Sequence, residues 1–138
     1  MAALRRVVLL VRDVQASAAW YAALGLRATV LAPGTHARLD GGGGGGVPLD
    51  LLLAPREAEL CTGYSPALHV ELPEGALDAL VPQLLAAGGR LDGPIRHGAD
   101  ATVAVLRSPD GHMLCLYECE PAGPRGAGGD VGAPTALR

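Results

Sequence analysis

The chain has 138 residues, 49% of them hydrophobic, and a formal net charge of −3 at pH 7. This length fits one domain, which can bury an apolar core without disulfides or a structural metal. No run of basic residues extends beyond Arg5 and Arg6, so the sequence predicts no nucleic-acid partner. No segment approaches the roughly 20 apolar residues of a membrane-spanning helix, which predicts no membrane partner. Three cysteines without a Cys-x-x-Cys motif, and a start unlike a signal peptide, favour a cytoplasmic protein.

The first half of the sequence predicts one strand, one helix and three further strands. Residues 7–11 are β-branched and aliphatic, as in a buried strand. Asp13 is a preferred helix N-cap, the Ala-rich residues 14–24 predict a helix, and Gly25 ends it. Turn residues then separate three short apolar runs. These predict strands at 26–31, 36–40 and 47–53.

The second half predicts the same order of elements. Residues 67–72 predict a strand and 75–87 a helix, followed by strands at 90–95, 102–106 and 113–117. Pro82 lies inside the helix, so we expect a kink or a shortened first turn there. Beyond Pro121, Gly and Pro dominate and predict a disordered tail over 121–138. The fold class is therefore α+β, with two βαβββ modules at about 4–54 and 66–119 in one domain of residues 1–120.

The two halves also share a register, as expected for a duplicated unit. Arg6 lies seven residues before Asp13, and Ala67 lies seven before Glu74, each near the start of a predicted helix. In the same way, Asp50 follows a glycine by four residues, and so does Cys115. Arg6 and Ala67 are therefore predicted to be equivalent positions, and so are Asp50 and Cys115.

Three segments of the sequence resemble a known superfamily. The first strand leads through Asp13 and Ser17 into a helix that carries Trp20-Tyr21 and ends in Leu24-Gly25, and a Ser108–Gly111 turn precedes the last strand. These features, with the helix end AAGGRLDGP, resemble the vicinal oxygen chelate superfamily. It includes glyoxalase I, extradiol dioxygenases, fosfomycin-resistance enzymes and bleomycin-binding proteins. The likeness covers about residues 4–119 and is greatest to short glyoxalase I-like proteins.

The resemblance implies a glyoxalase/bleomycin-resistance fold, in which two modules form an open, curled mixed sheet around a cavity. In metal-dependent members, four side chains from four strands hold a divalent ion. Those positions fall on Arg6, Asp50, Ala67 and Cys115. Arginine cannot ligate a cation and alanine has no donor atom, so we expect no metal cofactor. If nickel, zinc or manganese does bind, Asp50 and His69 are the first candidate ligands.

Several interpretations stay open for the residues of the implied cavity. Strand alternation places Arg6, Val8 and Leu10 on one face. Arg6 either pairs with Asp50, replacing metal charge by protein charge, or holds a carboxylate, phosphate or enolate-like ligand. His69 is a candidate base, a ligand of a relocated metal with Asp50 and His36, or a histidine that only hydrogen-bonds a neighbour. Asp50 and His69 are the candidate catalytic residues. The predicted ligand-binding set is Arg6, Val8, Asp50, Leu52, His69 and Cys115.

Other conspicuous residues are interpreted as structural. Cys115 becomes a nucleophile only if Arg6 lowers its pKa, and an inert buried thiol is the commoner case. Trp20 and Tyr21 are expected to pack the first helix on its sheet. His112 is expected to face solvent or a dimer partner. The glycine run 41–46 lacks the Lys-Ser/Thr of a phosphate loop and is interpreted as a turn. We assign no chemistry to Cys61 or Cys119.

Three functions follow from the resemblance and the altered ligand positions. The leading hypothesis is a glyoxalase I-like protein that binds a small polar or anionic metabolite without the usual metal. The second is a lactoylglutathione lyase-like isomerase or lyase that uses a metal. The third is a non-catalytic sequestering protein of the bleomycin-resistance type. A homodimer is expected by the same resemblance.

Overall fold

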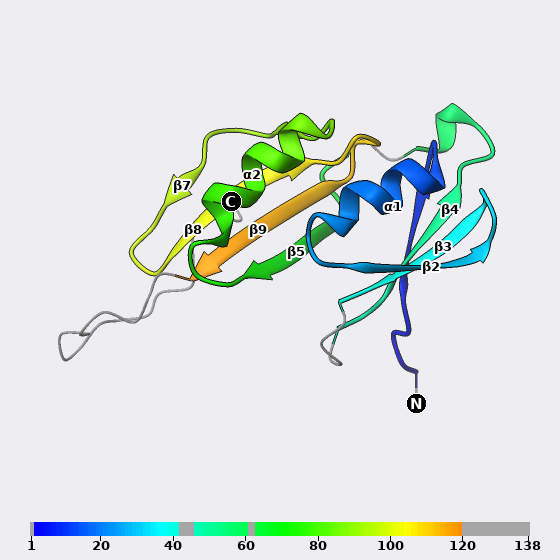
Figure 1. The fold of residues 1–138 in the computed structure, drawn as a ribbon, viewed down its shortest axis with the longest axis horizontal. Helices are drawn as coiled ribbons and strands as arrows, with labels where there is room; N and C mark the ends of the chain where they lie inside the picture. Colours follow the sequence, from blue (N-terminus) through cyan, green and yellow to red (C-terminus); the bar gives the residue numbers. More distant parts are fainter. Residues whose placement is uncertain (1, 42–45, 61–62, 120–138) are drawn as a thin grey trace. The chain divides into compact units, whose positions relative to one another are not determined.

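A computed structural model describes residues 2–41, 46–60 and 63–119. The predicted tail at 121–138, Cys61 and most of the glycine run lie outside this part of the chain. The contacts divide the protein into two compact units, residues 1–62 with Pro109–Gly111, and residues 63–108 with 112–138. Each unit holds its own sheet and helix (Figure 1). In the described ranges, no helix is both long enough and apolar enough to cross a membrane.

The first unit contains a four-stranded sheet in the order β1-β4-β3-β2. β1 pairs with β4 in parallel, and the other neighbours are antiparallel. Asp13 caps α1 as predicted, because its carboxylate accepts a hydrogen bond of 2.9 Å from the Ala16 N–H. The elements are β1 (Val7–Val11), α1 (Val14–Ala22), β2 (Arg27–Ala32), β3 (His36–Asp40), β4 (Leu49–Leu53) and a short 3₁₀ helix, η1 (Glu57–Glu59).

Alternation along the strands builds the core of this unit. Leu9, Leu39 and Leu51 are at most 3% exposed, and their strands pack one face against α1. Trp20 and Tyr21 are also buried, with their rings edge-to-face at 5.0 Å, so their predicted role in packing the helix is confirmed. The residues of β1, β3 and β4 that come between these buried ones therefore lie on the other face of the sheet.

The second unit contains a five-stranded sheet with the path β5-β9-β8-β6, and β7 also pairs with β8. β5 and β9 are parallel, as β1 and β4 are. The predicted βαβββ order is confirmed in the first unit, and the second unit follows it with one strand more after its helix. The Glu118 carboxylate accepts a hydrogen bond of 3.2 Å from the Leu77 N–H in the first turn of α2, where Gly75 offers no side-chain cap. The elements are β5 (Ala67–Leu72), α2 (Ala76–Ala86), β6 (Arg90–Leu91), β7 (Arg96–His97), β8 (Ala101–Arg107) and β9 (Met113–Cys119).

Two predictions for this unit are wrong in detail. Residues 90–95 do not form one strand, because Gly93 has φ +102° and Pro94 follows it. Only the first two of them form a strand, β6, and the next strand, β7, begins at Arg96. Of the two effects expected of Pro82, a kink or a shortened first turn, the shortened turn is wrong, since the helix begins at Ala76 and includes Pro82. Pro82 and Asp78 are both exposed, so water can solvate the Asp78 carbonyl that lacks its helical partner.

The strand pairings agree with the predicted duplication. Val8 pairs with Asp50 between β1 and β4, and His69 pairs with Cys115 between β5 and β9. Val8 and His69 each lie two residues after the first member of a predicted pair, Arg6 or Ala67. The two units therefore place equivalent residues at equivalent points of their sheets.

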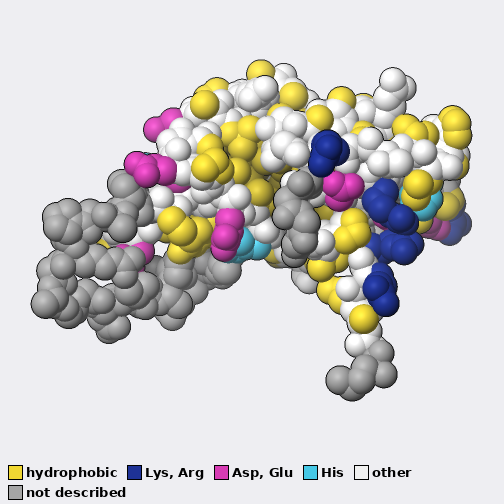
Figure 2. All heavy atoms as spheres, turned by 60° about the horizontal axis from the view of Figure 1, so that its bottom comes forward, with side chains coloured by type: hydrophobic (Ala, Val, Ile, Leu, Met, Phe, Trp, Pro, Cys, Tyr) yellow, Lys and Arg dark blue, Asp and Glu magenta, His cyan; other side chains and the backbone are white. Residues whose placement is uncertain are grey.

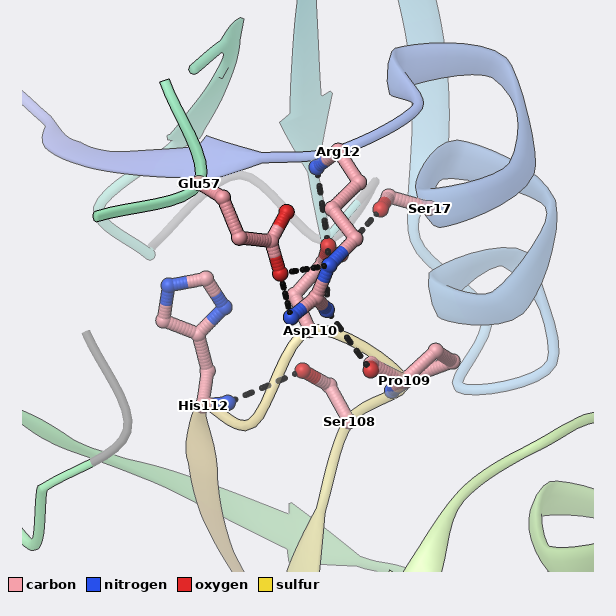
Figure 3. A network of polar contacts seen from close by, with 7 residues as sticks. All are labelled: Arg12, Ser17, Glu57, Ser108, Pro109, Asp110 and His112. Carbon is pink, nitrogen blue, oxygen red and sulfur yellow. Dashed lines mark hydrogen bonds and ion pairs between the residues drawn. The ribbon is translucent and has the colours of Figure 1, made fainter. Parts of the chain in front are cut away.

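The residues that carry the family resemblance form a polar network in the first unit (Figure 3). The buried carboxylate of Asp110 accepts hydrogen bonds from the Ser17 hydroxyl at 2.7 Å and from the Arg12 N–H at 2.8 Å. The Arg12 side chain donates to Glu57 at 2.7 Å and to the Pro109 carbonyl at 3.4 Å. This network fixes the turn 109–111 to α1 and to the end of β1. Its members are structural rather than members of the predicted ligand-binding set.

His112 differs from its prediction. It is 5% exposed instead of facing solvent or a partner. Its backbone N–H donates a hydrogen bond of 3.0 Å to the Ser108 hydroxyl. This hydrogen bond joins the two residues that flank the turn 109–111. The tight turn thus buries the residue that follows Gly111.

Candidate functional site

Asp50 is the centre of a cationic cluster on the first sheet. This β4 residue is only 2% exposed. The Arg38 guanidinium donates two hydrogen bonds to it, from Nε to Oδ1 at 2.7 Å and from Nη2 to Oδ2 at 3.0 Å. His36 Nε2 lies 2.8 Å from Oδ2, and Arg6 Nη1 lies 3.9 Å from the same oxygen. We call Arg6, His36, Arg38 and Asp50 the arginine cluster.

The register of three neighbouring strands assembles this cluster. Arg38 on β3 is the direct cross-strand partner of Asp50, and His36 lies two residues away on the same face. On the other side, Val8 of β1 is the partner of Asp50, and Arg6 lies two residues before it, just ahead of the strand. All four side chains lie on the face opposite α1. Figure 2 shows arginine side chains gathered on this unit.

The electrostatics of the cluster keep Asp50 ionised. The hydrogen bonds from Arg38 are the largest cause that lowers the pKa of Asp50, with a further contribution from His36, and they outweigh the opposing effect of burial. The result is a pKa of about 2. The same contact raises the pKa of Arg38 above its usual value. Asp50 is therefore a charged hydrogen-bond acceptor over the whole physiological range of pH.

The structure brings part of the predicted ligand-binding set together. Arg6, Val8, Asp50 and Leu52 share one face of the first sheet. The predicted pairing of Arg6 with Asp50 exists only as a long 3.9 Å ion pair, because Arg38 takes the bidentate position. Sequence reasoning missed Arg38, although alternation from His36 along β3 places it on the same face.

The resemblance would place the ligands of a divalent ion at Arg6, Asp50, Ala67 and Cys115, and these residues do not fit one. Arg6 is a cation, and Ala67 has no donor atom. Both oxygens of Asp50 already accept hydrogen bonds from Arg38. Burial raises the pKa of the Cys115 thiol, which disfavours the thiolate that binds metals. Among the described residues, no group of three or more His, Cys, Asp or Glu side chains is placed to hold a metal ion.

The second unit contains the other two members of the predicted set. His69 on β5 is exposed and pairs with the fully buried Cys115 on β9. The His69 ring lies 5.2 Å from that of Tyr117, at an angle of 36°. Cys115 has the burial and the raised pKa of an inert thiol. Cys119 is exposed and has no assigned chemistry.

Equivalent positions in the two sheets have different chemistry. The cross-strand partner of Cys115 on β8 is Val105, and that of Tyr117 is Val103. In the first unit the corresponding residues are Arg38, which pairs with Asp50, and His36, which pairs with Leu52. The duplicated framework therefore carries a cationic cluster in the first unit and apolar residues at the same points of the second.

Comparison with known proteins identifies the family. A family model for the glyoxalase-like domain matches residues 6–117. No match was found among curated proteins.

Solved structures show the same fold. A glyoxalase/bleomycin resistance protein/dioxygenase family enzyme from Burkholderia phytofirmans PsJN is 22% identical, with a TM-score of 0.70 over 86% of this chain and 100% of that chain. A glyoxalase-related enzyme from Fulvimarina pelagi is 23% identical, with a TM-score of 0.67 over 96% and 98%. The fosfomycin resistance protein FosX from Listeria monocytogenes is 13% identical, with a TM-score of 0.67 over 86% and 93%. With its family model and the same framework repeated in its two units, the chain belongs to the glyoxalase-like domain family of the vicinal oxygen chelate superfamily.

Proposed function

We propose that this protein binds a small anionic metabolite at the arginine cluster, without a metal ion. The observation that carries this proposal is the convergence of two arginines and one histidine on a single buried carboxylate. Asp50 can neutralise only one of the two guanidinium charges. The cluster thus keeps an excess positive charge, which attracts an anion.

Donor groups in the cluster support the same conclusion. Arg38 directs Nε and Nη2 at Asp50, which leaves its Nη1 donors available to a ligand. The Arg6 side chain is 45% exposed, and its 3.9 Å approach to Asp50 is too long for a hydrogen bond. Guanidinium groups suit carboxylates and phosphates because their planar donors form paired hydrogen bonds.

The state of Asp50 favours binding over catalysis. A general base works best when its pKa is near the working pH, and a carboxyl group with a pKa of about 2 accepts a proton poorly at neutral pH. Asp50 instead holds Arg38 and His36 in place. His69 and Cys115 lie in the second unit and take no part in this proposal.

The first experiment is an NMR titration of chelator-treated protein that follows the side-chain Nε–H signals of arginine. Acetate and inorganic phosphate serve as probes. We expect saturable shifts of the Arg6 and Arg38 signals, and about tenfold weaker binding in Arg6→Gln. Arg90→Gln is the matched control, because Arg90 is an exposed arginine of β6 in the second unit.

The outcomes separate the alternatives. If neither anion perturbs these signals, the proposal is wrong. If the methylglyoxal–glutathione hemithioacetal is turned over after addition of nickel or zinc, the protein is instead a lactoylglutathione lyase-like enzyme. Tight binding of a ligand without product favours the sequestering role.

A further inference from the structure

Apolar side chains border the arginine cluster on the same face of the first sheet. Val8, the neighbour of Asp50 on β1, is 49% exposed. Leu10 and Leu52 pair with each other in the next row and are partly exposed. Because side chains alternate along a strand, all three point away from α1, as Asp50 does. An exposed apolar strip thus begins directly beside the cationic group.

The charge of this face matches one anionic group rather than two. Arg6 and Arg38 carry two positive charges, and Asp50 removes one of them. At the edge of the same face, Arg27 on β2 is the cross-strand partner of Asp40 on β3, and the formal charges of these two residues sum to zero. Counted over Arg6, Arg38 and Asp50, the net charge is +1. A second anionic group on the ligand would meet no second excess charge here.

A comparison of the two duplicated units also indicates a single site for an anionic group. At the points of the second sheet equivalent to Arg38, His36 and Asp50, the residues are Val105, Val103 and Cys115. The second unit therefore has no copy of the cluster at these positions. Within residues 2–41, 46–60 and 63–119, these equivalent positions form the head-group site in the first unit alone, although the framework is duplicated.

We infer that the ligand is a singly charged organic acid with an apolar body, of the monocarboxylate class. This inference rests on the proposed function and specifies its ligand. The carboxylate accepts hydrogen bonds from Arg6 and from Nη1 of Arg38. The aliphatic or aryl body covers Val8, Leu10 and Leu52, which removes their exposed surface from water.

Four probes test the charge and the apolar body separately by calorimetric titration at pH 7.5. Hexanoate has both features, acetate has only the head group, 1-hexanol has only the body, and adipate adds a second carboxylate. A fully buried methylene changes affinity about fourfold. An open sheet face covers only about half of the hydrocarbon chain of hexanoate. We therefore expect hexanoate to bind on the order of ten times more tightly than acetate. We also expect 1-hexanol and adipate each to bind about tenfold more weakly than hexanoate.

A matched pair of variants locates the apolar contact. Val8→Asn should weaken hexanoate binding about threefold and leave acetate binding unchanged. Val30→Asn is the control, because Val30 lies on β2 of the same sheet and is 65% exposed. Both valines are exposed enough for the variants to fold, which circular dichroism would verify.

The results distinguish this inference from the function on which it rests. Equal binding of acetate and hexanoate would overturn the apolar body, and tighter binding of adipate would overturn the single charge, while both leave anion binding intact. If none of the three anions binds, the proposed function itself fails. Weaker hexanoate binding in Val8→Asn, with Val30→Asn unchanged, supports the inference.

Discussion

Replacing Asp50 by asparagine tests whether the arginine cluster stabilises the fold through one ionised carboxylate. Asparagine keeps the shape of the side chain and removes its charge. In the folded protein, the contacts with Arg38 and His36 lower the pKa of Asp50 from 3.8 to about 2. At about 1.4 kcal/mol for each tenfold change in proton affinity, this corresponds to roughly 2 kcal/mol of stability at neutral pH. Arg38 keeps contact with water, with its side chain 31% exposed, so we add no further cost for a stranded buried charge.

The pH dependence gives this prediction a definite sign. Because the pKa of Asp50 is lower in the folded state, the unfolded chain binds a proton to this group more readily. The stabilisation is therefore complete above about pH 4 and is lost as the pH falls through about 2. Urea unfolding of the parent and Asp50→Asn, followed by circular dichroism from pH 7 to pH 2, measures the difference.

The control for this experiment is Glu74→Gln, which removes an exposed carboxylate from the turn before α2. Its free energy of unfolding should change by less than about 0.5 kcal/mol. Equal stability of Asp50→Asn and the parent at pH 7 would refute the reasoning. So would a difference between them that persists unchanged at pH 2.

Three further substitutions test the framework. Ser17→Ala leaves an oxygen of buried Asp110 without its 2.7 Å hydrogen bond and should cost about 1–3 kcal/mol in denaturant unfolding; an unchanged midpoint would contradict the role of that contact. Glu118→Gln weakens the cap of α2 and should cost about 1 kcal/mol, while the exposed Glu71→Gln on β5 should not. Leu39→Ala opens a cavity at a fully buried site and should cost about 2–5 kcal/mol, whereas a loss below 1 kcal/mol would show that the core repacks.

Local patterns were sufficient to predict most of the fold. Val7–Val11, His36–Asp40 and Ala67–Leu72 form strands with the predicted bounds, because alternating apolar side chains and flanking turn residues act within a few positions. Asp13 caps α1 for an equally local reason. The prediction failed at residues 90–95, where one glycine and one proline outweigh the strand pattern around them. Local sequence thus determined the order of the elements and the duplicated register.

The candidate site depended on contacts that the sequence does not show. Alternation placed Arg6 and Asp50 on one face, but only the β3–β4 register makes Arg38 the bidentate partner of Asp50. The contact between Ser17 and Asp110 joins residues 93 positions apart. Sequence identified the side chains that can carry charge. The tertiary structure decided which charges neutralise each other, because charge pairing depends on distances of a few ångströms between separate strands.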